Sequence, residues 1–236
     1  STTRKRFGAR ITLWIWGQAR AYAQYQDQLN QHAFGNYRHL LEEMALSPVM
    51  GIYLSHLRNR KEATTTGRVP DENFAREVMQ LFSIGLYELN LDGSLKRDAN
   101  GNPVETYSNA DVMALAKVFT GWSWAFADSE LTDAKFRGGS PDYSVAKDQR
   151  IDLLPMKAYP GQHSPVAKAL FSGKPWATTI AANGTAQADL KQALDALFNH
   201  PNVGPFIGRQ LIQRLVTSQP TPAYVARVAA VFNNNG

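Results

Sequence analysis

The segment DENFAREVMQLFSIGL, residues 71–86, gathers polar residue types that could do chemistry on one side of a predicted helix. At 100° per residue, its apolar side chains fill one arc, and Leu81 and Phe74 belong to that arc. The opposite arc holds Glu72, Asn73, Arg76, Glu77 and Gln80. A carboxylate at the seam between the arcs, as at Glu77, could work as a general acid or base.

Two interpretations of this polar arc are open. An ordinary solvated face would use Glu72 and Arg76 as an i,i+4 ion pair that stabilises the helix by a few tenths of a kcal/mol. A functional site would leave Glu77 partly buried and give Arg76 a distant acceptor. A partly buried carboxylate needs a donor, for which we expect His163, Lys168 or Arg209.

Further motifs follow in a fixed order. YSNADVMALAKVFTGW comes after a Gly/Asn-rich stretch, and FNHPNVGPFIGRQLIQRLV comes near the end of the chain. Together with ENFAREVMQLFSIGL, these segments resemble the bacterial family catalogued as domain of unknown function 1800. The similarity runs from about FGNYRHLLEEMALSPVM to the C-terminus. The resemblance implies an exported protein, often encoded beside a second exported family, and it implies no particular activity.

The resemblance also singles out positions. The family pattern is matched from Asn73 to Glu77 and again at Thr120, Gly121 and Trp122. It departs at Gln80, where the family commonly has an acidic residue. It departs again at His163-Ser164, where the family commonly has His-Asp, although Lys168 is retained. A mechanism that needs either missing carboxylate is in doubt for this chain.

From these positions we draw a set of candidate site residues. The catalytic candidates are Glu77 and His163, because histidine is a natural proton carrier near neutral pH. The substrate-binding candidates are Asn73, Arg76, Trp122 and Lys168. For Trp122, with Trp124 and Phe126 nearby, a role in the core is favoured over stacking on a sugar.

The elements that must position these residues are mainly helices. SPVMGIYLSHLR has Ser47 as N-cap and Pro48 at the first helical position, and TPAYVARVAAVF repeats this with Thr221 and Pro222. Ser108 begins a further helix. Gly121 ends that helix, and Pro201 ends another in the segment FNHPNVG, where the charge of His200 would complement the helix dipole.

Two regions break the helical pattern. Residues 88–107 carry Asp-Gly and Asn-Gly turn signals between short alternating runs and predict a small β-hairpin. Residues 123–184 are rich in Gly, Pro and aromatics without periodicity and predict a long irregular insertion. We therefore predict a mainly α, multi-helix globular domain over residues 1–236, as a fragment of a longer chain, with these two additions.

Composition excludes several classes of protein. The chain of 236 residues has no cysteine, so disulfides, thiolate nucleophiles and Cys-ligated zinc are excluded. Its formal net charge of +5 comes without a basic stripe, and nucleic-acid binding is not predicted. The apolar run ITLWIW is too short to span a bilayer. The five histidines lack ligand spacing, and DANGNP lacks the glycine and glutamate of a calcium loop. We predict no metal and no cofactor.

Two hypotheses for function remain. The first is a binding or assembly protein of the cell envelope, periplasmic or extracellular, that works with a second exported protein. The second is a carboxylate-dependent hydrolase of an extracellular polymer such as a polysaccharide, with Glu77 and His163 as proton carriers and Asn73 and Arg76 orienting the substrate. Convergence of these side chains in one pocket would favour the hydrolase.

Overall fold

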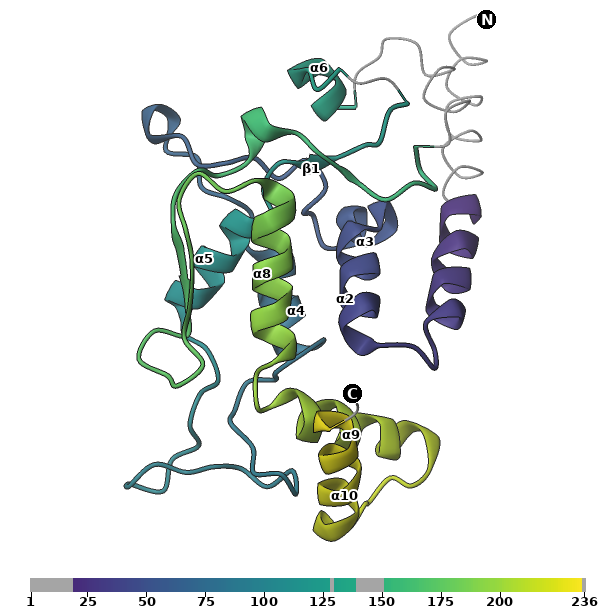
Figure 1. The fold of residues 1–236 in the computed structure, drawn as a ribbon, viewed down its shortest axis with the longest axis vertical. Coiled ribbons are helices and arrows are strands. Elements are labelled where there is room, and N and C mark those ends of the chain that lie inside the picture. The colour runs from purple at the N-terminus through teal and green to yellow at the C-terminus, as the bar shows by residue number, and fades with distance from the viewer. Residues whose placement is uncertain (1–18, 128–129, 139–150, 235–236) are drawn as a thin grey trace, which may run out of the picture. The chain divides into compact units, whose positions relative to one another are not determined.

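A computed structural model describes residues 19–127, 130–138 and 151–234 (Figure 1). The chain forms two compact units, each assembled from separate stretches. The first unit comprises the described parts of Ser1–Asp71, Phe119–Ser164 and Thr185–Gln187. The second comprises those of Glu72–Val118, Pro165–Gly184 and Ala188–Gly236. The single-domain organisation stays a prediction.

The predicted fold class is confirmed, because helices dominate the described residues. In the first unit, residues 19–31 are helical, and the further elements are α2 (Tyr37–Leu46), α3 (Pro48–Tyr53), η1 (Thr64–Thr66), β1 (Trp122–Ser123), α6 (Asp133–Phe136), β2 (Lys157–Ala158) and η2 (Pro160–Gln162). In the second unit the elements are α4 (Asn73–Gln80), α5 (Asn109–Val118), β3 (Lys168–Leu170), β4 (Thr178–Ile180), α8 (Ala186–Phe198), α9 (Val203–Leu215) and α10 (Pro222–Asn233). The first two residues of α8 are assigned to the first unit, and the helix belongs to the second unit from Ala188 on.

Local sequence signals set where several helices begin. Ser47 occupies the N-cap of α3 with Pro48 in the first turn, as predicted. The Thr221 side chain accepts a hydrogen bond from the backbone of Tyr224 at the start of α10. The Ser108 hydroxyl and backbone both donate to the Asp111 carboxylate ahead of α5. The hydrogen bonds at Thr221 and Asp111 satisfy backbone N–H groups that a helix start leaves without partners, whereas the Ser47 side chain makes no such bond.

The predicted hairpin over residues 88–107 is present as three short paired stretches. Isolated antiparallel bridges join Tyr87 to Glu105, Leu89 to Leu95, and Arg97 to Pro103. The Asp-Gly and Asn-Gly pairs form the two turns, in which Gly93 and Gly101 have positive φ angles of 79° and 84°. The pattern predicted one hairpin, and the chain folds as two successive turns.

The described part of the insertion over residues 123–184 contains short strands. β1 and β2 pair antiparallel in the first unit, with Trp122 opposite Ala158. β3 and β4 pair antiparallel in the second unit, with Lys168 opposite Ile180. Residues 128–129 and 139–150 of the insertion lie outside the described residues.

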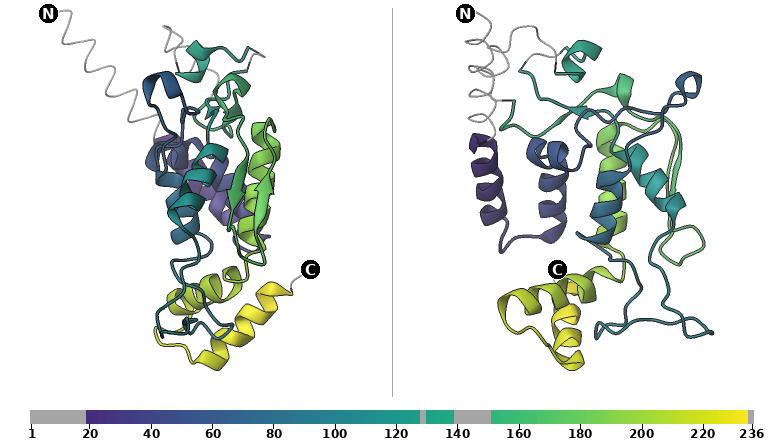
Figure 2. Two further views of the ribbon diagram at one scale, coloured as in Figure 1. Left: turned by 90° about the vertical axis from the view of Figure 1, so that its left-hand side faces the viewer. Right: turned by 180° about the vertical axis from the view of Figure 1, so that it is seen from behind.

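In the second unit the β3–β4 hairpin lies against α5, and α4 packs against the same helix (Figure 2). The apolar side chains of these elements and of α8 form a core with little or no exposed surface. Its members include Phe74, Val78, Met79, Val112, Leu115, Leu170, Ile180, Leu190 and Leu194. This core anchors α4, α8 and β3, which carry the polar residues Glu77, Asp189 and Lys168.

Candidate functional site

The polar face of α4 behaves as a solvated helix face at Arg76. The Arg76 guanidinium lies 3.2 Å from the Glu72 carboxylate, one turn earlier, and both side chains are partly exposed. The i,i+4 pair is therefore present, and the expectation of a distant acceptor for Arg76 is wrong. Asn73, at the start of the helix, is exposed.

Glu77 is partly buried, as predicted for a residue at the seam of the helix. No hydrogen bond or ion pair to its carboxylate is found among the residues that the structure describes. The pKa of the Tyr107 hydroxyl is raised chiefly by burial, and the negative charge of Glu77 raises it further. Leu81, expected to pack beside it, is 50% exposed because the helix ends at Gln80.

The donors expected for Glu77 are bonded elsewhere in the second unit. Lys168 pairs with Asp189, and Arg209 donates to the backbone oxygen of Gly93 at 3.3 Å. The prediction is wrong for these two. The third candidate, His163, belongs to the first unit.

Lys168 and Asp189 form a completely buried ion pair. The ammonium on β3 and the carboxylate in the first turn of α8 are 2.5 Å apart, and neither side chain has exposed surface. Gly184 makes room for it, because a Cβ there would lie 2.1 Å from the Asp189 Oδ1 atom. The sequence pointed to Lys168 but not to its partner, since the two are 21 residues apart.

In the first unit, the Thr-Gly-Trp motif follows α5 and enters β1. Trp122 is only 4% exposed, and Phe126 is 5% exposed. The favoured core role of Trp122 therefore agrees with its burial. Its indole N–H is buried and has no hydrogen-bond partner among the described residues.

His163 lies directly against this motif at the end of η2. It is 5% exposed, and its Nδ1 atom is 2.8 Å from the Thr120 carbonyl oxygen. A carbonyl can only accept, so Nδ1 carries the hydrogen and the neutral ring keeps its lone pair on Nε2. The approach is close because residue 121 is glycine at φ +82°, where a Cβ would meet the His163 backbone nitrogen at 2.8 Å.

Glu62 joins this cluster and is the residue that sequence reasoning missed. The Thr120 hydroxyl accepts from the Ser164 backbone N–H at 2.9 Å. The Ser164 hydroxyl donates to Glu62 Oε1 at 3.0 Å. The second oxygen, Oε2, is buried and has no hydrogen-bond partner among the described residues. The one signal that could have pointed here is Ser164 itself, where the family pattern commonly has aspartate.

The candidate site of the first unit is thus a hydrogen-bonded cluster of Glu62, Thr120, His163 and Ser164. It brings together a carboxylate oxygen and an imidazole, which are the groups needed for proton transfer. Of the predicted site residues, Trp122 and His163 lie in this unit, whereas Asn73, Arg76, Glu77 and Lys168 lie in the other.

Two kinds of feature are absent from the described residues. Among residues 19–127, 130–138 and 151–234, no group of three or more His, Asp or Glu side chains is arranged to hold a metal ion. In the same ranges, no helix is both long and apolar enough to cross a membrane.

Comparison with known proteins identifies the family. The model of the family described as "Protein of unknown function (DUF1800)" matches residues 15–236. No curated protein and no solved structure matches the chain.

Proposed function

Since this chain belongs to the DUF1800 family, whose description names no activity, we propose a function from its geometry. In this proposal the protein is a binding or assembly protein that docks a partner protein through α9. The observation that carries the proposal is an apolar stripe on α9 that is buried at one end of the helix and exposed at the other.

The stripe is defined by residues three and four apart on α9, which lie on the same side of a helix. Its first part, Gly204, Ile207 and Gly208, is buried in the second unit. Its last part is exposed, with Leu211 at 47% and Leu215 at 78%. Apolar side chains exposed next to one another on a helix are typical of a surface that meets another protein.

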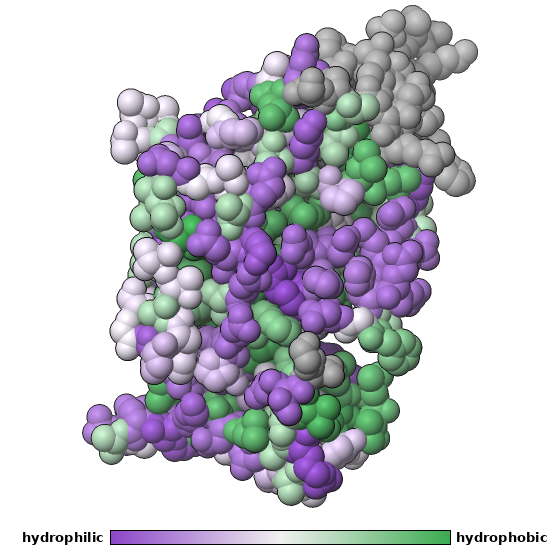
Figure 3. All heavy atoms as spheres, in the orientation of Figure 1, coloured by the Kyte–Doolittle hydropathy of each residue, from purple (hydrophilic) through white to green (hydrophobic). Residues whose placement is uncertain are grey.

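One neighbouring side chain enlarges this surface. Val216, directly after α9, is 67% exposed. Figure 3 shows apolar side chains at the lower right, over the end of α9 in Figure 1. We call Leu211, Leu215 and Val216 the α9 surface.

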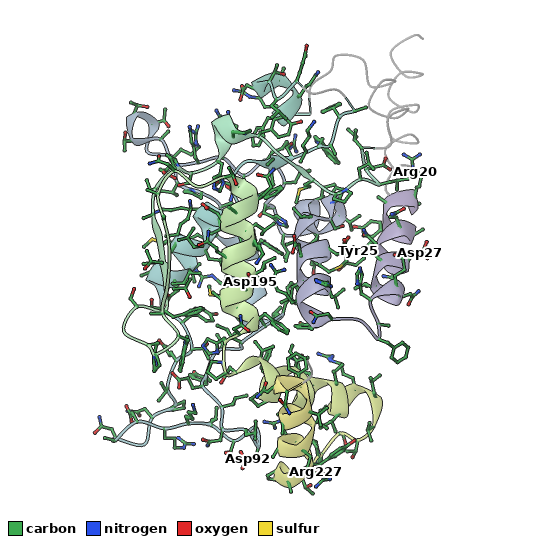
Figure 4. The ribbon with its side chains drawn as sticks, viewed as in Figure 1. Arg20, Tyr25, Asp27, Asp92, Asp195 and Arg227 are labelled. Atoms are coloured by element: carbon green, nitrogen blue, oxygen red, sulfur yellow. The ribbon has the colours of Figure 1, made fainter. Side chains whose placement is uncertain are left out.

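Charge indicates the chemistry of the partner. Every acidic residue of the chain lies at or before Asp195, whereas Arg209, Arg214 and Arg227 follow it. None of these three arginines forms an ion pair with a described residue. Arg227, labelled on α10 in Figure 4, instead lies over the ring of Tyr224. Unneutralised positive charge beside apolar side chains favours a partner that surrounds its own apolar contact with Asp and Glu.

A protein partner fits this surface better than a lipid bilayer does. Helices that lie in a membrane surface expose an apolar face along their whole length. On α9 the stripe is exposed only in its last part, because its first part packs inside the unit. A single helix or strand of a partner would cover the exposed part of the stripe, Leu211 and Leu215. The apolar contacts of the buried part would then continue into the partner.

Photo-crosslinking in the native host tests the proposal. A photoreactive residue at Leu215 should capture one protein that the same residue at the exposed Asn100 turn does not capture. That protein, once purified, should bind the intact chain, more weakly at high salt. Its affinity should fall about ten-fold or more for the double variant Leu211→Ser/Leu215→Ser.

Three results would count against a docked protein. The captured protein could bind the double variant as tightly as the parent chain, or position 100 could capture the same protein. Alternatively, the chain could bind vesicles containing phosphatidylglycerol through Leu215, which would identify a lipid surface instead.

We place this role in the cell envelope, with a second exported protein as partner. The support is the resemblance described above, in which family members are exported. Fractionation of cells that make the full natural protein should find it outside the cytoplasm, and a cytoplasmic location would contradict this part of the proposal.

A second candidate function, hydrolysis of an extracellular polymer, is favoured by one observation in the first unit. Glu62 presents a buried carboxylate oxygen without a partner among the described residues, in the same hydrogen-bonded cluster as His163. Glu62 would then act beside the predicted catalytic residue His163, and the predicted catalytic carboxylate Glu77 is the alternative in the second unit. A panel of envelope polysaccharides tests this with Glu62→Gln and Glu77→Gln side by side. Loss of hydrolysis in one variant alone identifies the carboxylate that acts, and no hydrolysis by the parent chain removes this candidate.

A further inference from the structure

A group of aromatic and charged side chains in the second unit surrounds His200, at a place that the proposed function does not use. His200 follows α8 and is 2% exposed. Its ring meets the rings of Phe171 and Trp176 edge to face, at centroid distances of 5.2 and 4.8 Å. Both aromatic residues come from the segment between β3 and β4.

The tautomer of His200 follows from one backbone contact. The backbone N–H of Asn202 donates to His200 Nδ1 at 3.1 Å. Because an amide N–H can only donate, Nδ1 is the acceptor nitrogen and the neutral ring carries its hydrogen on Nε2. Burial lowers the pKa of His200 to about 4, so the ring is neutral at physiological pH.

Two N–H groups in this place lack an acceptor. The Nε2 atom of His200 and the Nε1 atom of Trp176 are both buried, and neither has a hydrogen-bond partner among the described residues. A buried N–H without an acceptor costs free energy comparable to a lost hydrogen bond. Two such donors in contacting side chains therefore call for acceptor atoms, which a buried water or a ligand supplies.

The charges around the two donors favour an anion of single charge. Lys174 lies 2.5 Å and Lys96 lies 3.6 Å from the Glu88 carboxylate. With His200 neutral, these two cations and one anion leave an excess of one positive charge. Lys174 also lies over the ring of Trp176, at 5.8 Å from its centroid.

Hydrogen bonds hold this group in place next to His200, through Asn202, and on the segment that carries Trp176, through Phe171. The side chain of Asn202 donates to the backbone oxygens of Ile84 and Tyr87 and accepts from the backbone N–H of Leu89. The backbone N–H of Phe171, a residue at φ +58°, donates to Asp111 at 2.5 Å. The two donors thus belong to a preorganised frame, which lowers the entropy lost on binding.

We propose that His200 and Trp176 bind the carboxylate group of a small acid or of a peptide. A carboxylate has two acceptor oxygens for the two N–H groups, and its single negative charge matches the excess at Glu88, Lys96 and Lys174. Edge-to-face contact of each N–H with a ring is the competing arrangement. In that arrangement the weak N–H···π contacts alone would satisfy both donors.

Nuclear magnetic resonance of the full 236-residue chain tests the proposal. The indole N–H signal of Trp176 is assigned by its loss in Trp176→Phe, a variant that keeps an aromatic ring beside His200. Titration with acetate, propionate and succinate at constant ionic strength should move this signal and that of His200 Nε2–H in a saturable way. Acetamide and chloride, the neutral and simple-anion controls, should not.

Amino-acid variants distinguish a loss of acetate binding at this site from a general loss of folding. Trp176→Phe and Lys174→Gln should each weaken acetate binding about ten-fold or more, since each removes a hydrogen bond or charge that faces the anion. Trp124→Phe, in the first unit, should leave it unchanged. Thermal unfolding of each variant shows that the chain still folds.

The source of the carboxylate is distinguished with peptides. A short peptide with a free C-terminus should compete with acetate if the site accepts chain ends, and its amidated form should not. If only the small acids bind, the site takes a free metabolite. No saturable shift of either signal with any carboxylate, or equal shifts with chloride, would overturn the proposal and leave the edge-to-face arrangement as the explanation.

Discussion

The Lys168 ammonium and the Asp189 carboxylate meet at 2.5 Å with no exposed surface on either side chain. A buried ion pair of this kind is costly to break from one side, because the remaining charge stays desolvated. We expect Lys168→Met to reduce the free energy of unfolding by about 3–5 kcal/mol. Denaturant unfolding should show that Lys168→Met/Asp189→Leu is less destabilised than the sum of the single variants. Additive losses would mean that the pair is not coupled.

Gly121→Ala should destabilise the first unit more than backbone strain alone explains. A non-glycine residue in the left-handed region costs about 1–2 kcal/mol. At φ +82°, position 121 adds a clash of the new Cβ with the backbone of His163 at 2.8 Å. Gly173→Ala, at φ +81° with nothing within 4 Å of the Cβ, is the matched control. Equal losses of unfolding free energy in the two variants would show that His163 is not held against the Thr-Gly-Trp motif.

Acid should destabilise the protein through two buried histidines. Burial lowers the pKa of His56 and of His200 from 6.5 to about 4. Both are neutral in folded and unfolded chains above pH 6.5, where their contribution to stability is complete. As pH falls from 6.5 toward 4, only the unfolded chain gains a proton at these positions, so stability is lost. The loss is about 1.4 kcal/mol per pH unit for each histidine.

Denaturant unfolding at several pH values between 7.5 and 4.5 measures this slope. His56→Gln and His200→Gln should each flatten it, whatever their effect on stability at pH 7.5. A slope unchanged in both variants would mean that other groups cause the acid sensitivity.

Glu77→Gln should change the free energy of unfolding by no more than about 0.5 kcal/mol. A partly buried carboxylate with no hydrogen bond or ion pair among the described residues loses little on neutralisation. Arg76→Gln is the neighbouring control, since it removes the exposed pair with Glu72 and should cost a similarly small amount. A loss above 1 kcal/mol in Glu77→Gln alone would indicate a donor that pairs with this carboxylate.

The parts of the fold that could be predicted from the sequence are those fixed by neighbours along the chain. The caps at Ser108 and Thr221 bond to residues three positions away. The turns at Gly93 and Gly101 need the positive φ that glycine permits. Such features depend on a few adjacent residues, so a short pattern is enough to locate them.

The site could not be predicted in the same way, because its contacts join distant residues. Ser164 and Glu62 are 102 positions apart, and Asn202 bonds to backbone groups more than 110 positions away. Which polar side chain meets which depends on packing of the whole unit. The expectation that the charge of His200 would complement a helix dipole failed for this reason, since burial keeps the ring neutral at physiological pH.

The turn at Asn100-Gly101 is a suitable place to insert a tag. The Asp98 side chain accepts hydrogen bonds from the backbones of Asn100 and Asn102, so the turn is organised by its own residues. It is exposed, and nothing lies within 4 Å of a Cβ built at Gly101. Exposed turns of this kind tolerate inserted sequence. An epitope or a dye-labelling tag placed here would let both binding proposals be followed without touching the residues that they concern.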